Sequence, residues 1–222
     1  PGIASVFDNH PEIEVVQFTE TSEANILQHV GNYDAAILGV APFTPAIVKM
    51  ADKMQIVARH GVGYDAVNVP ALTEAGIPLA VVGIANSITV AEHSLFFMMA
   101  LAKRAFLFDR ETRKGNWDIR REVPAYDLAG RKVLVLGFGR IGRRLVPMLN
   151  AMQMDVHVYD PYVVQDSITT AGATIVEDFR AVLGDMDFVS VNCPKDEATT
   201  GMIGKAEIEA MKPTAFLVNT AR

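Results

Sequence analysis

The stretch Lys132-Val133-Leu134-Val135-Leu136-Gly137-Phe138-Gly139-Arg140-Ile141-Gly142 joins a short apolar run to three closely spaced glycines. The run predicts a buried strand, and a helical pattern over residues 141–152 follows it at once. In this order the first glycine allows a tight turn, the second lets the backbone approach a pyrophosphate, and the third lets helix pack closely on strand. The helix N-terminus adds unpaired N–H groups and a partial positive charge. We therefore predict a dinucleotide site at this loop.

An acidic residue at the end of the next predicted strand strengthens this interpretation. Asp160 follows a strand over residues 155–159, near the separation of about 20 residues expected for an acid that binds ribose hydroxyls. A carboxylate at this point accepts hydrogen bonds from the adenosine ribose and repels a 2′-phosphate, which favours NAD over NADP. The alternative is an ordinary aspartate at a strand end before Pro161.

Composition narrows the class of protein. Of the 222 residues, 50% are hydrophobic and 21% are charged, and the net charge is −6. This charge disfavours a nucleic-acid partner, which needs a basic face. A single cysteine excludes a disulfide framework, and no Cys/His cluster has the spacing of a metal site. No apolar run approaches the roughly 20 residues of a membrane span, so we expect a cytoplasmic protein without a membrane partner.

Strand-like and helix-like segments alternate along the chain. We expect strands over residues 13–18, 35–40, 55–58, 77–82, 133–136, 155–159, 173–176, 188–191 and 215–218. We expect helices over residues 22–30, 44–50, 70–75, 141–152, 178–183 and 205–211. Such alternation predicts an α/β fold whose parallel sheets are covered on both faces. The chain opens without a first strand and ends directly after one, so we expect a piece of a longer chain.

A long apolar segment lies between the two halves. A helix start near Thr89, with Glu92 three residues later, fits a capping box, and the apolar residues continue from Leu95 to Leu107. Because this helix is apolar nearly all round, we expect it to be buried between domains or at a subunit interface. A homodimer is the prediction that follows.

Five short motifs occur in one order and together resemble a known family. They are Gly61-Val62-Gly63-Tyr64-Asp65, Asn86-Ser87-Ile88-Thr89-Val90-Ala91-Glu92-His93, the glycine loop, Tyr159-Asp160-Pro161-Tyr162 and Asn219-Thr220-Ala221-Arg222. The chain resembles the D-isomer-specific 2-hydroxyacid dehydrogenases, in the branch of phosphoglycerate dehydrogenase and hydroxypyruvate reductase. The resemblance implies an NAD-dependent enzyme that interconverts a small D-2-hydroxy acid and its 2-keto acid by hydride transfer. It also implies two Rossmann-like or flavodoxin-like parallel-sheet domains with a cleft between them. The first, at residues 1–90, would bind the substrate, and the second, at residues 91–222, would be an NAD-binding Rossmann domain.

The resemblance assigns roles to individual residues. Arg222 matches the catalytic arginine, which would clamp the substrate carboxylate and polarise the carbonyl, as a fixed guanidinium can. Val62 and Gly63 would bind the carboxylate through their backbone N–H groups, although this loop taken alone is also an ordinary tight turn. Asn86 would contact the substrate. The residues that would contact the cofactor are Ser87, Gly137, Gly139, Arg140, Ile141, Gly142, Asp160, Cys193, Thr220 and Ala221.

Two catalytic residues of the family are not matched in this sequence. The acid–base pair of the family, a glutamate and a histidine, lies beyond the arginine at which this chain ends, and we nominate none of the five histidines in their place. Cys193 could be a reactive thiol, but packing at a buried strand end is the favoured interpretation. The sequence does not identify the 2-hydroxy acid, and the segment Val40-Ala41-Pro42-Phe43 offers no cation for a phosphate.

Two other functions are compatible with a nucleotide-binding fold. One is an NAD-binding regulatory protein of the same architecture, like the C-terminal-binding co-repressors, but nothing in the first third of the chain marks a peptide groove. The other is a nucleotide-binding enzyme such as a methyltransferase. The ending Asn219-Thr220-Ala221-Arg222 argues against the latter.

Overall fold

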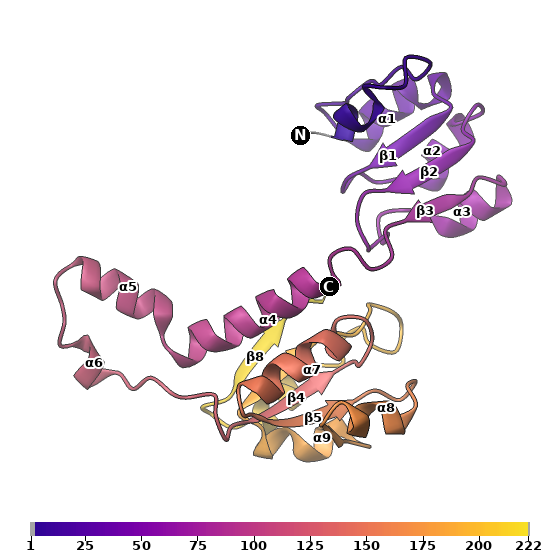
Figure 1. Ribbon diagram of the computed structural model, residues 1–222. Coiled ribbons are helices and arrows are strands. Elements are labelled where there is room, and N and C mark those ends of the chain that lie inside the picture. Colours follow the sequence, from indigo (N-terminus) through magenta and orange to yellow (C-terminus); the bar gives the residue numbers. More distant parts are fainter. Residues whose placement is uncertain (1–2, 222) are drawn as a thin grey trace. The chain divides into compact units, whose positions relative to one another are not determined.

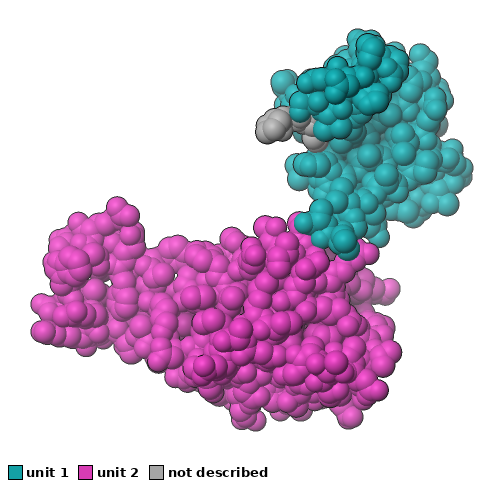
Figure 2. Space-filling model, in the orientation of Figure 1, with its two compact units in different colours: residues 1–85 teal, residues 86–222 magenta. Residues whose placement is uncertain are grey.

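The computed structural model describes residues 3–221 and divides into two compact units, residues 1–85 and 86–222 (Figure 2). Each unit has its own parallel β-sheet and its own hydrophobic core, which confirms the predicted α/β class. The division falls before the predicted boundary at 90/91. Helix α4 (Ser87–Ala102) packs against α7 (Gly142–Ala151) of the second unit, so its first turn cannot be assigned to the first.

The first unit is a three-stranded sheet with helices packed against it (Figure 1). The strands pair in parallel in the order β1 (Ala35–Leu38), β2 (Ile56–Arg59) and β3 (Leu79–Val81). The helical elements are η1 (Ile3–Phe7), α1 (Glu23–His29), η2 (Val30–Asn32), α2 (Pro45–Met50) and α3 (Val69–Glu74). Buried side chains from these strands and helices, among them Phe43, Ile47 and Leu72, form the core.

Polar side chains cap the N-termini of the α-helices of this unit. The hydroxyl of Ser22 accepts a hydrogen bond from the Asn25 N–H at 3.3 Å, so Ser22 is the N-cap of α1. Thr44 caps α2 in the same way, and the side chain of Asn68 caps α3. Such caps satisfy N–H groups that the first turn of a helix leaves without partners.

The strand predicted over residues 13–18 is wrong. This segment is irregular, and Ile13, Val15 and Val16 are exposed. Its alternating apolar residues suit a half-buried strand, but a strand also needs a neighbour for its backbone groups. Among the described strands β1 pairs with β2 alone, so no strand lies on its other side to pair with this segment.

The second unit is a five-stranded parallel sheet with the strand order β6-β5-β4-β7-β8. The strands are β4 (Lys132–Leu136), β5 (Asp155–Tyr159), β6 (Thr174–Ile175), β7 (Phe188–Val191) and β8 (Phe216–Asn219). Besides α4 and α7, the helical elements that accompany the sheet are α8 (Gln165–Thr170), α9 (Phe179–Val182), η3 (Leu183–Asp185) and α10 (Lys205–Ala210). The order doubles back at β4, because the chain adds β5 and β6 on one side and β7 and β8 on the other.

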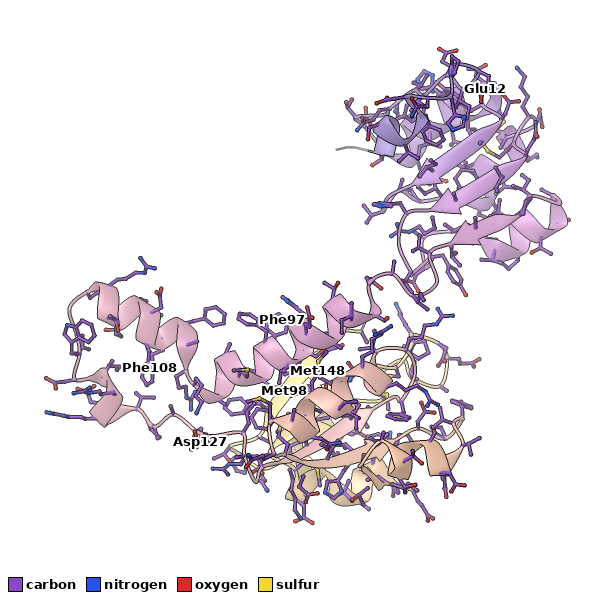
Figure 3. All side chains as sticks on the ribbon, viewed as in Figure 1. Glu12, Phe97, Met98, Phe108, Asp127 and Met148 are labelled. Carbon is purple, nitrogen blue, oxygen red and sulfur yellow. The ribbon has the colours of Figure 1, made fainter. Side chains whose placement is uncertain are left out.

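Both faces of the central strand are covered. Val133 and Val135 belong to the core that includes α4 and α7, whereas Leu134 and Leu136 belong to the core that includes α9. A parallel strand buried on both faces has a continuous apolar sequence, which explains the unbroken run before the glycine loop. Met98 of α4 is fully buried in the first of these cores, and Met148 of α7 packs against it (Figure 3).

The apolar segment between the units differs from its prediction in two respects. Helix α4 begins at Ser87 rather than near Thr89, and the side chain of its N-cap, Asn86, makes no capping hydrogen bond, so the predicted capping box is wrong. The helix ends at Ala102 rather than near Leu107. Arg104 adopts a left-handed conformation, with φ of 52°, and the chain bends there before the next helix.

That next helix is α5 (Ala105–Arg113), and the short α6 (Ile119–Glu122) follows it. We refer to residues 105–122 as the arm. Figure 1 shows α5 and α6 extending from the end of α4 away from the sheet of the second unit. No residue of either helix is buried. The segment after Gly115 thus contains one helical turn, α6, whose side chains are exposed except for the half-buried Ile119.

Candidate functional site

Two of the three glycines in the loop after β4 are required by close backbone approaches. Gly137 has φ of 99°, and a Cβ on it would lie 2.9 Å from the backbone nitrogen of Cys193. Gly142 is the first residue of α7, and a Cβ there would lie 2.2 Å from the carbonyl oxygen of Gly137. A side chain at either position would force the end of β7 or the start of α7 away from β4.

The glycine between them has a different environment. No protein atom outside the immediate chain lies within 4 Å of the position that a Cβ on Gly139 would occupy. Arg140 beside it is exposed, and Ile141 is the N-cap of α7. The loop thus leaves open space beside backbone N–H groups at a helix N-terminus, which is the environment that binds a pyrophosphate.

Asp160 is hydrogen-bonded directly to this loop. Its Oδ2 accepts a hydrogen bond from the Phe138 N–H at 2.7 Å, and its Oδ1 accepts one from the Tyr162 N–H at 2.9 Å. The carboxylate is half-buried and each oxygen keeps a further lone pair. The side chain of Phe138 is buried, and the Arg143 guanidinium lies 4.7 Å from the centre of its ring. The loop and the acid are therefore held as one rigid piece.

The sheet explains why these residues meet. β5 and β7 flank β4 and run parallel to it, so the carboxyl ends of the three strands lie at the same edge. That edge carries Gly137, Asp160 and Cys193, at the point where the strand order doubles back. Open α/β sheets bind ligands at such a switch point.

Cys193 has the properties of a packing residue. Burial raises the pKa of its thiol, and nearby carboxylates add to the effect. Its Sγ donates to the thioether sulfur of Met202 at 3.5 Å. A thiol with a raised pKa forms little thiolate and is a poor nucleophile, which agrees with the interpretation favoured from the sequence.

Ser87 and Thr220 make contacts with protein groups. Ser87 is 2% exposed, and its hydroxyl accepts a hydrogen bond from Nε of Arg144 on α7 at 2.9 Å. The hydroxyl of Thr220 lies 2.9 Å from that of Ser94 on α4. Neither Ser94 nor Arg144 was predicted from the sequence, where Ser94 is one of several polar residues of α4 and has no distinguishing pattern.

In the first unit, Arg59 supports the loop that contains Val62 and Gly63. Its Nη1 donates to the carbonyl oxygens of Leu38, at 3.2 Å, and of His60, at 2.5 Å. A Cβ on Gly61 would lie 2.9 Å from this nitrogen, and Gly61 has φ of 150°. The guanidinium therefore fills the space inside the turn.

The predicted site residues are divided between the units. Val62 and Gly63 belong to the first unit, while Asn86, the glycine loop, Asp160 and residues 193, 220 and 221 belong to the second. Arg222, the predicted catalytic residue, lies outside the described residues.

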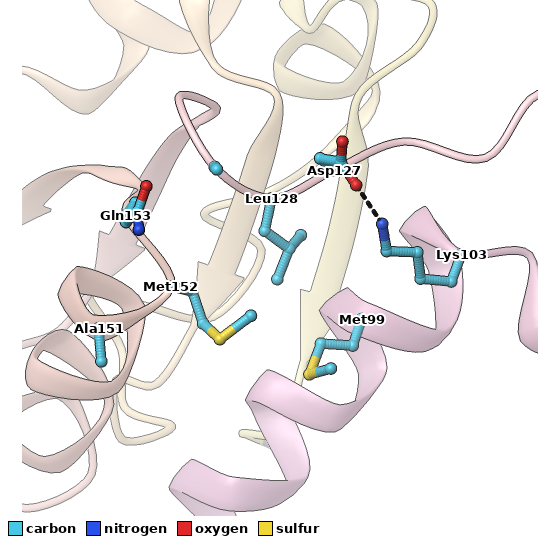
Figure 4. Close-up of a pocket in the computed structure, with 8 residues that line it drawn as sticks. Met99, Lys103, Asp127, Leu128, Ala151, Met152 and Gln153 are labelled. Atoms are coloured by element: carbon cyan, nitrogen blue, oxygen red, sulfur yellow. Dashed lines mark hydrogen bonds and ion pairs between the residues drawn. The ribbon is translucent and has the colours of Figure 1, made fainter.

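A separate hollow lies at the opposite end of the strands from the glycine loop (Figure 4). It is formed where α4 and α7 end and by the segment that precedes β4, with Met99, Leu128 and Met152 as its apolar lining. An ion pair between Lys103 and Asp127 lies at this hollow. It holds none of the predicted site residues.

Two classes of feature are absent from the described part of the chain. No helix within residues 3–221 is long and apolar enough to cross a membrane. Over the same residues, His, Cys, Asp and Glu side chains form no group that could hold a metal ion.

Comparison with known proteins identifies the relatives of the chain. Residues 95–222 match the NAD binding domain of the D-isomer specific 2-hydroxyacid dehydrogenases. The chain is 31% identical over 211 residues to D-3-phosphoglycerate dehydrogenase of Archaeoglobus fulgidus, a match that covers 95% of this chain and 40% of that protein. It is 32% identical over 205 residues to glyoxylate reductase of Korarchaeum cryptofilum, covering 90% of this chain and 61% of the relative.

A solved structure shares the fold. D-lactate dehydrogenase from Aquifex aeolicus, complexed with NAD and lactic acid, superimposes with a TM-score of 0.89 at 22% identity. The match covers 99% of this chain and 66% of that one. The chain therefore spans 40% of the curated phosphoglycerate dehydrogenase from Archaeoglobus and about two thirds of this solved relative.

Proposed function

The chain belongs to the family of D-isomer specific 2-hydroxyacid dehydrogenases, and from this we propose that it interconverts a small D-2-hydroxy acid and its 2-keto acid with NAD. The observation that carries the proposal is the hydrogen bond that links the glycine loop, through the Phe138 N–H, to the carboxylate of Asp160. A tight turn, an open space beside Gly139 and a fixed carboxylate occur together at the carboxyl edge of a parallel sheet. This combination fits a dinucleotide and has no other evident use.

The residues of the second unit would hold the cofactor. Backbone N–H groups around Gly139 and Ile141 would bind the pyrophosphate, and Asp160 would accept hydrogen bonds from the adenosine ribose. The negative charge of Asp160 disfavours a 2′-phosphate, so the site suits NAD better than NADP. When bound, NAD accepts or supplies the hydride at its nicotinamide ring.

Other residues would hold the substrate. The N–H groups of Val62 and Gly63 would bind the carboxylate, and Asn86 would contact the rest of a small 2-keto acid. The guanidinium of Arg222 would bind the same carboxylate and stabilise the charge that develops on the reacting oxygen, the role in which fixed cations lower the barrier most effectively. We propose no residue of residues 1–222 for the proton transfer that accompanies the hydride.

The arm supports the proposal of a homodimer. The side chains of Phe106 and Trp117 are each 66% exposed, and Phe96 and Met99 of the neighbouring α4 are 49% and 39% exposed. Phe96 and Phe106 lie edge to face, with ring centroids 6.4 Å apart. Large exposed apolar side chains that lie together, as Phe96 and Phe106 do, are typical of an interface. We propose that a second copy covers these side chains. We also propose a cytoplasmic location, because one unpaired cysteine suits a reducing compartment.

A direct assay tests the enzymatic proposal. The gene product is supplied with NADH and a panel of 2-keto acids, including pyruvate, glyoxylate, hydroxypyruvate and its 3-phosphate, and NADH consumption is followed by absorbance. We expect one acid to be reduced, and chiral chromatography to identify the D-hydroxy acid. Binding of NADH without reduction of any acid would contradict the proposal and favour a regulatory NAD-binding protein.

A further inference from the structure

The hollow at the ends of α4 and α7 is apolar inside and polar at its rim (Figure 4). It has a volume of about 280 Å³, and Met99, Leu128 and Met152 line it. At the rim, Asp127 pairs with Lys103 through one carboxylate oxygen. The Asp127 side chain is 86% exposed, so its second oxygen can accept a further hydrogen bond. The hollow therefore suits an apolar ring system that carries one hydrogen-bond donor.

The single tryptophan of the chain has these properties. Trp117 belongs to the arm, and its side chain is 66% exposed. An indole is a large apolar ring system with one N–H group that donates and no acceptor. Tryptophan is also among the residues that most often anchor an interface, where it fills a pocket on the partner. Trp117 thus matches the hollow in chemistry.

The turn that presents Trp117 is held in place by Glu111 of α5. One oxygen of the Glu111 carboxylate accepts hydrogen bonds from Arg110 at 3.2 Å and from Lys114 at 3.0 Å. The other oxygen accepts a hydrogen bond from the side chain of Asn116 at 3.4 Å. The backbone carbonyl of Glu111 accepts the N–H groups of Lys114 and Asn116 as well. A side chain presented on such a preorganised turn loses little conformational freedom when it binds.

Trp117 and the hollow of the same chain lie toward opposite ends of α5. The hollow is beside the end of α4, and at Arg104 the chain bends so that α5 extends away from the sheet (Figure 1). The nine residues of α5 span about 13 Å. Among the described residues, those that line the hollow do not include any from the arm. A two-fold axis through the middle of the arm exchanges the two positions, so that each Trp117 reaches the hollow of the other copy.

The hollow is continuous with the exposed apolar side chains that we propose as a dimer interface. Met99 lines the hollow and is 39% exposed. It lies three residues after Phe96 on α4, and residues three apart share one face of a helix. Phe96 in turn lies edge to face with Phe106 of α5. One apolar surface therefore runs from the hollow along α4 to the arm.

We infer that Trp117 of each copy occupies the hollow of the other copy in a two-fold dimer. The inference rests on the homodimer proposed above and specifies the contact that holds it together. The indole ring packs against Met99, Leu128 and Met152, because thioether sulfurs and aromatic rings attract one another. Its N–H donates to the open carboxylate oxygen of Asp127. The largest apolar side chain of the arm is thereby removed from water twice in each dimer.

The fluorescence of Trp117 tests the inference, because the chain has no other tryptophan. An indole that moves from water into an apolar hollow emits at shorter wavelength. We expect the emission of the parent protein to move to longer wavelength on dilution, at the concentration where sedimentation equilibrium shows the dimer dissociating. Acrylamide should quench the emission of the dimer less than that of the monomer.

A variant that blocks the hollow and a matched control extend the test. Ala151 is an exposed residue of the lining and the last residue of α7, so Ala151→Arg places a charged side chain in the hollow. We expect its dimer to have a Kd about tenfold higher than that of the parent, with Trp117 emitting as an exposed indole. The control is Ala210→Arg, the same change at the exposed last residue of α10, a helix that packs against η3. It should dimerise and emit as the parent does.

A mixing experiment shows that the indole enters another copy rather than its own chain. Trp117→Ala has an open hollow and no tryptophan, so in a mixture with Ala151→Arg only the latter chain contributes tryptophan emission. We expect added Trp117→Ala to move the emission of Ala151→Arg to shorter wavelength, because a mixed dimer restores one of the two contacts. The same shift shows that both variants are folded.

The outcomes separate this inference from the proposed homodimer. The inference is overturned if the parent dimerises with unchanged emission, if Ala151→Arg dimerises like the parent, or if Ala210→Arg dissociates as readily as Ala151→Arg. It is also overturned if mixing the two chains leaves the emission unchanged. A parent protein that is monomeric throughout the micromolar range refutes the homodimer itself, and the inference with it.

Discussion

The backbone N–H of Phe138, in the middle of the glycine loop, donates a hydrogen bond to the carboxylate of Asp160 at 2.7 Å. The loop that would face the pyrophosphate and the acid that would face the ribose are therefore positioned by one another. The second carboxylate oxygen accepts from the Tyr162 N–H. Any change at Asp160 acts on the shape of the site as well as on its charge.

The first prediction concerns cofactor choice. In Asp160→Asn the amide nitrogen must face one of the two backbone N–H donors, so one hydrogen bond is lost, and with it the negative charge. We expect NADH to bind about tenfold more weakly, or about 1.4 kcal/mol, and the preference for NADH over NADPH to narrow. Fluorescence titration with both cofactors measures this. An unchanged ratio of the two affinities would show that Asp160 does not face the ribose.

A pair of glycine substitutions separates the shape of the loop from its binding role. Gly142→Ala places a methyl group against the Gly137 carbonyl, and we expect it to lower the free energy of unfolding by about 3 kcal/mol. Gly139→Ala adds a methyl group where no protein atom interferes. It should therefore unfold at nearly the parental urea concentration and still bind NADH at least tenfold more weakly. Full NADH affinity in folded Gly139→Ala would contradict the pyrophosphate site.

The third prediction is a dependence of stability on pH. Burial opposes ionisation of Asp187, but hydrogen bonds from the Lys132 N–H and from Lys212, with the charge of Arg131, outweigh it and lower the pKa of the carboxyl. Because the folded pKa lies below the unfolded value of about 3.9, the stabilisation is complete above that value and is lost as pH falls through the folded pKa.

Asp187→Asn tests this directly. Loss of charged hydrogen bonds should lower the free energy of unfolding at pH 7 by about 1.5–3 kcal/mol. The difference between parent and variant should shrink as the pH is taken well below 4. Urea unfolding curves at the two pH values provide the measurement, and a difference that persists undiminished in acid would exclude the ionised carboxylate as its source.

The last prediction concerns assembly. Phe106→Glu combined with Trp117→Glu adds charge to the exposed apolar surface of the arm, so a dimer formed through it should dissociate to monomers. Sedimentation equilibrium measures the change, and circular dichroism checks that helix content is kept. The pair Arg110→Glu and Arg120→Glu, which leaves the apolar residues in place, is the control. A parent protein that is monomeric at micromolar concentration would exclude the proposed interface.

Sequence patterns predicted most of the helices and strands because each pattern reflects a local cause. Strand β4 is apolar from Val133 to Leu136 because both of its faces are covered. Ser22 starts a helix because its hydroxyl accepts a hydrogen bond from an N–H three residues later. The prediction of a strand over residues 13–18 was wrong because a strand must pair with a neighbouring strand, and no local sequence pattern shows whether that neighbour exists. The predicted end of α4 was wrong because the helix is ended by a left-handed arginine, Arg104, rather than by a glycine or a proline.

The residues of the candidate site also fall into two groups, those that a local motif predicts and those that only the folded structure brings together. The glycines and Asp160 form a motif within about 25 residues, so their spacing alone predicted a dinucleotide-binding site. The contact between Ser94 and Thr220 joins residues 126 positions apart. Ser94 is one of several polar residues of α4, and only the packing of α4 beside β8 supplies its partner.

The arm also has a consequence for how the molecule resists local unfolding. Helices α5 and α6 bury no side chain of their own, and isolated helices of this length are marginal in water. Their amide hydrogens should exchange with deuterated solvent long before those of β4, which is inaccessible on both faces. If two copies associate through the arm, this exchange should slow as the protein concentration rises, because dimerisation would stabilise α5 and α6.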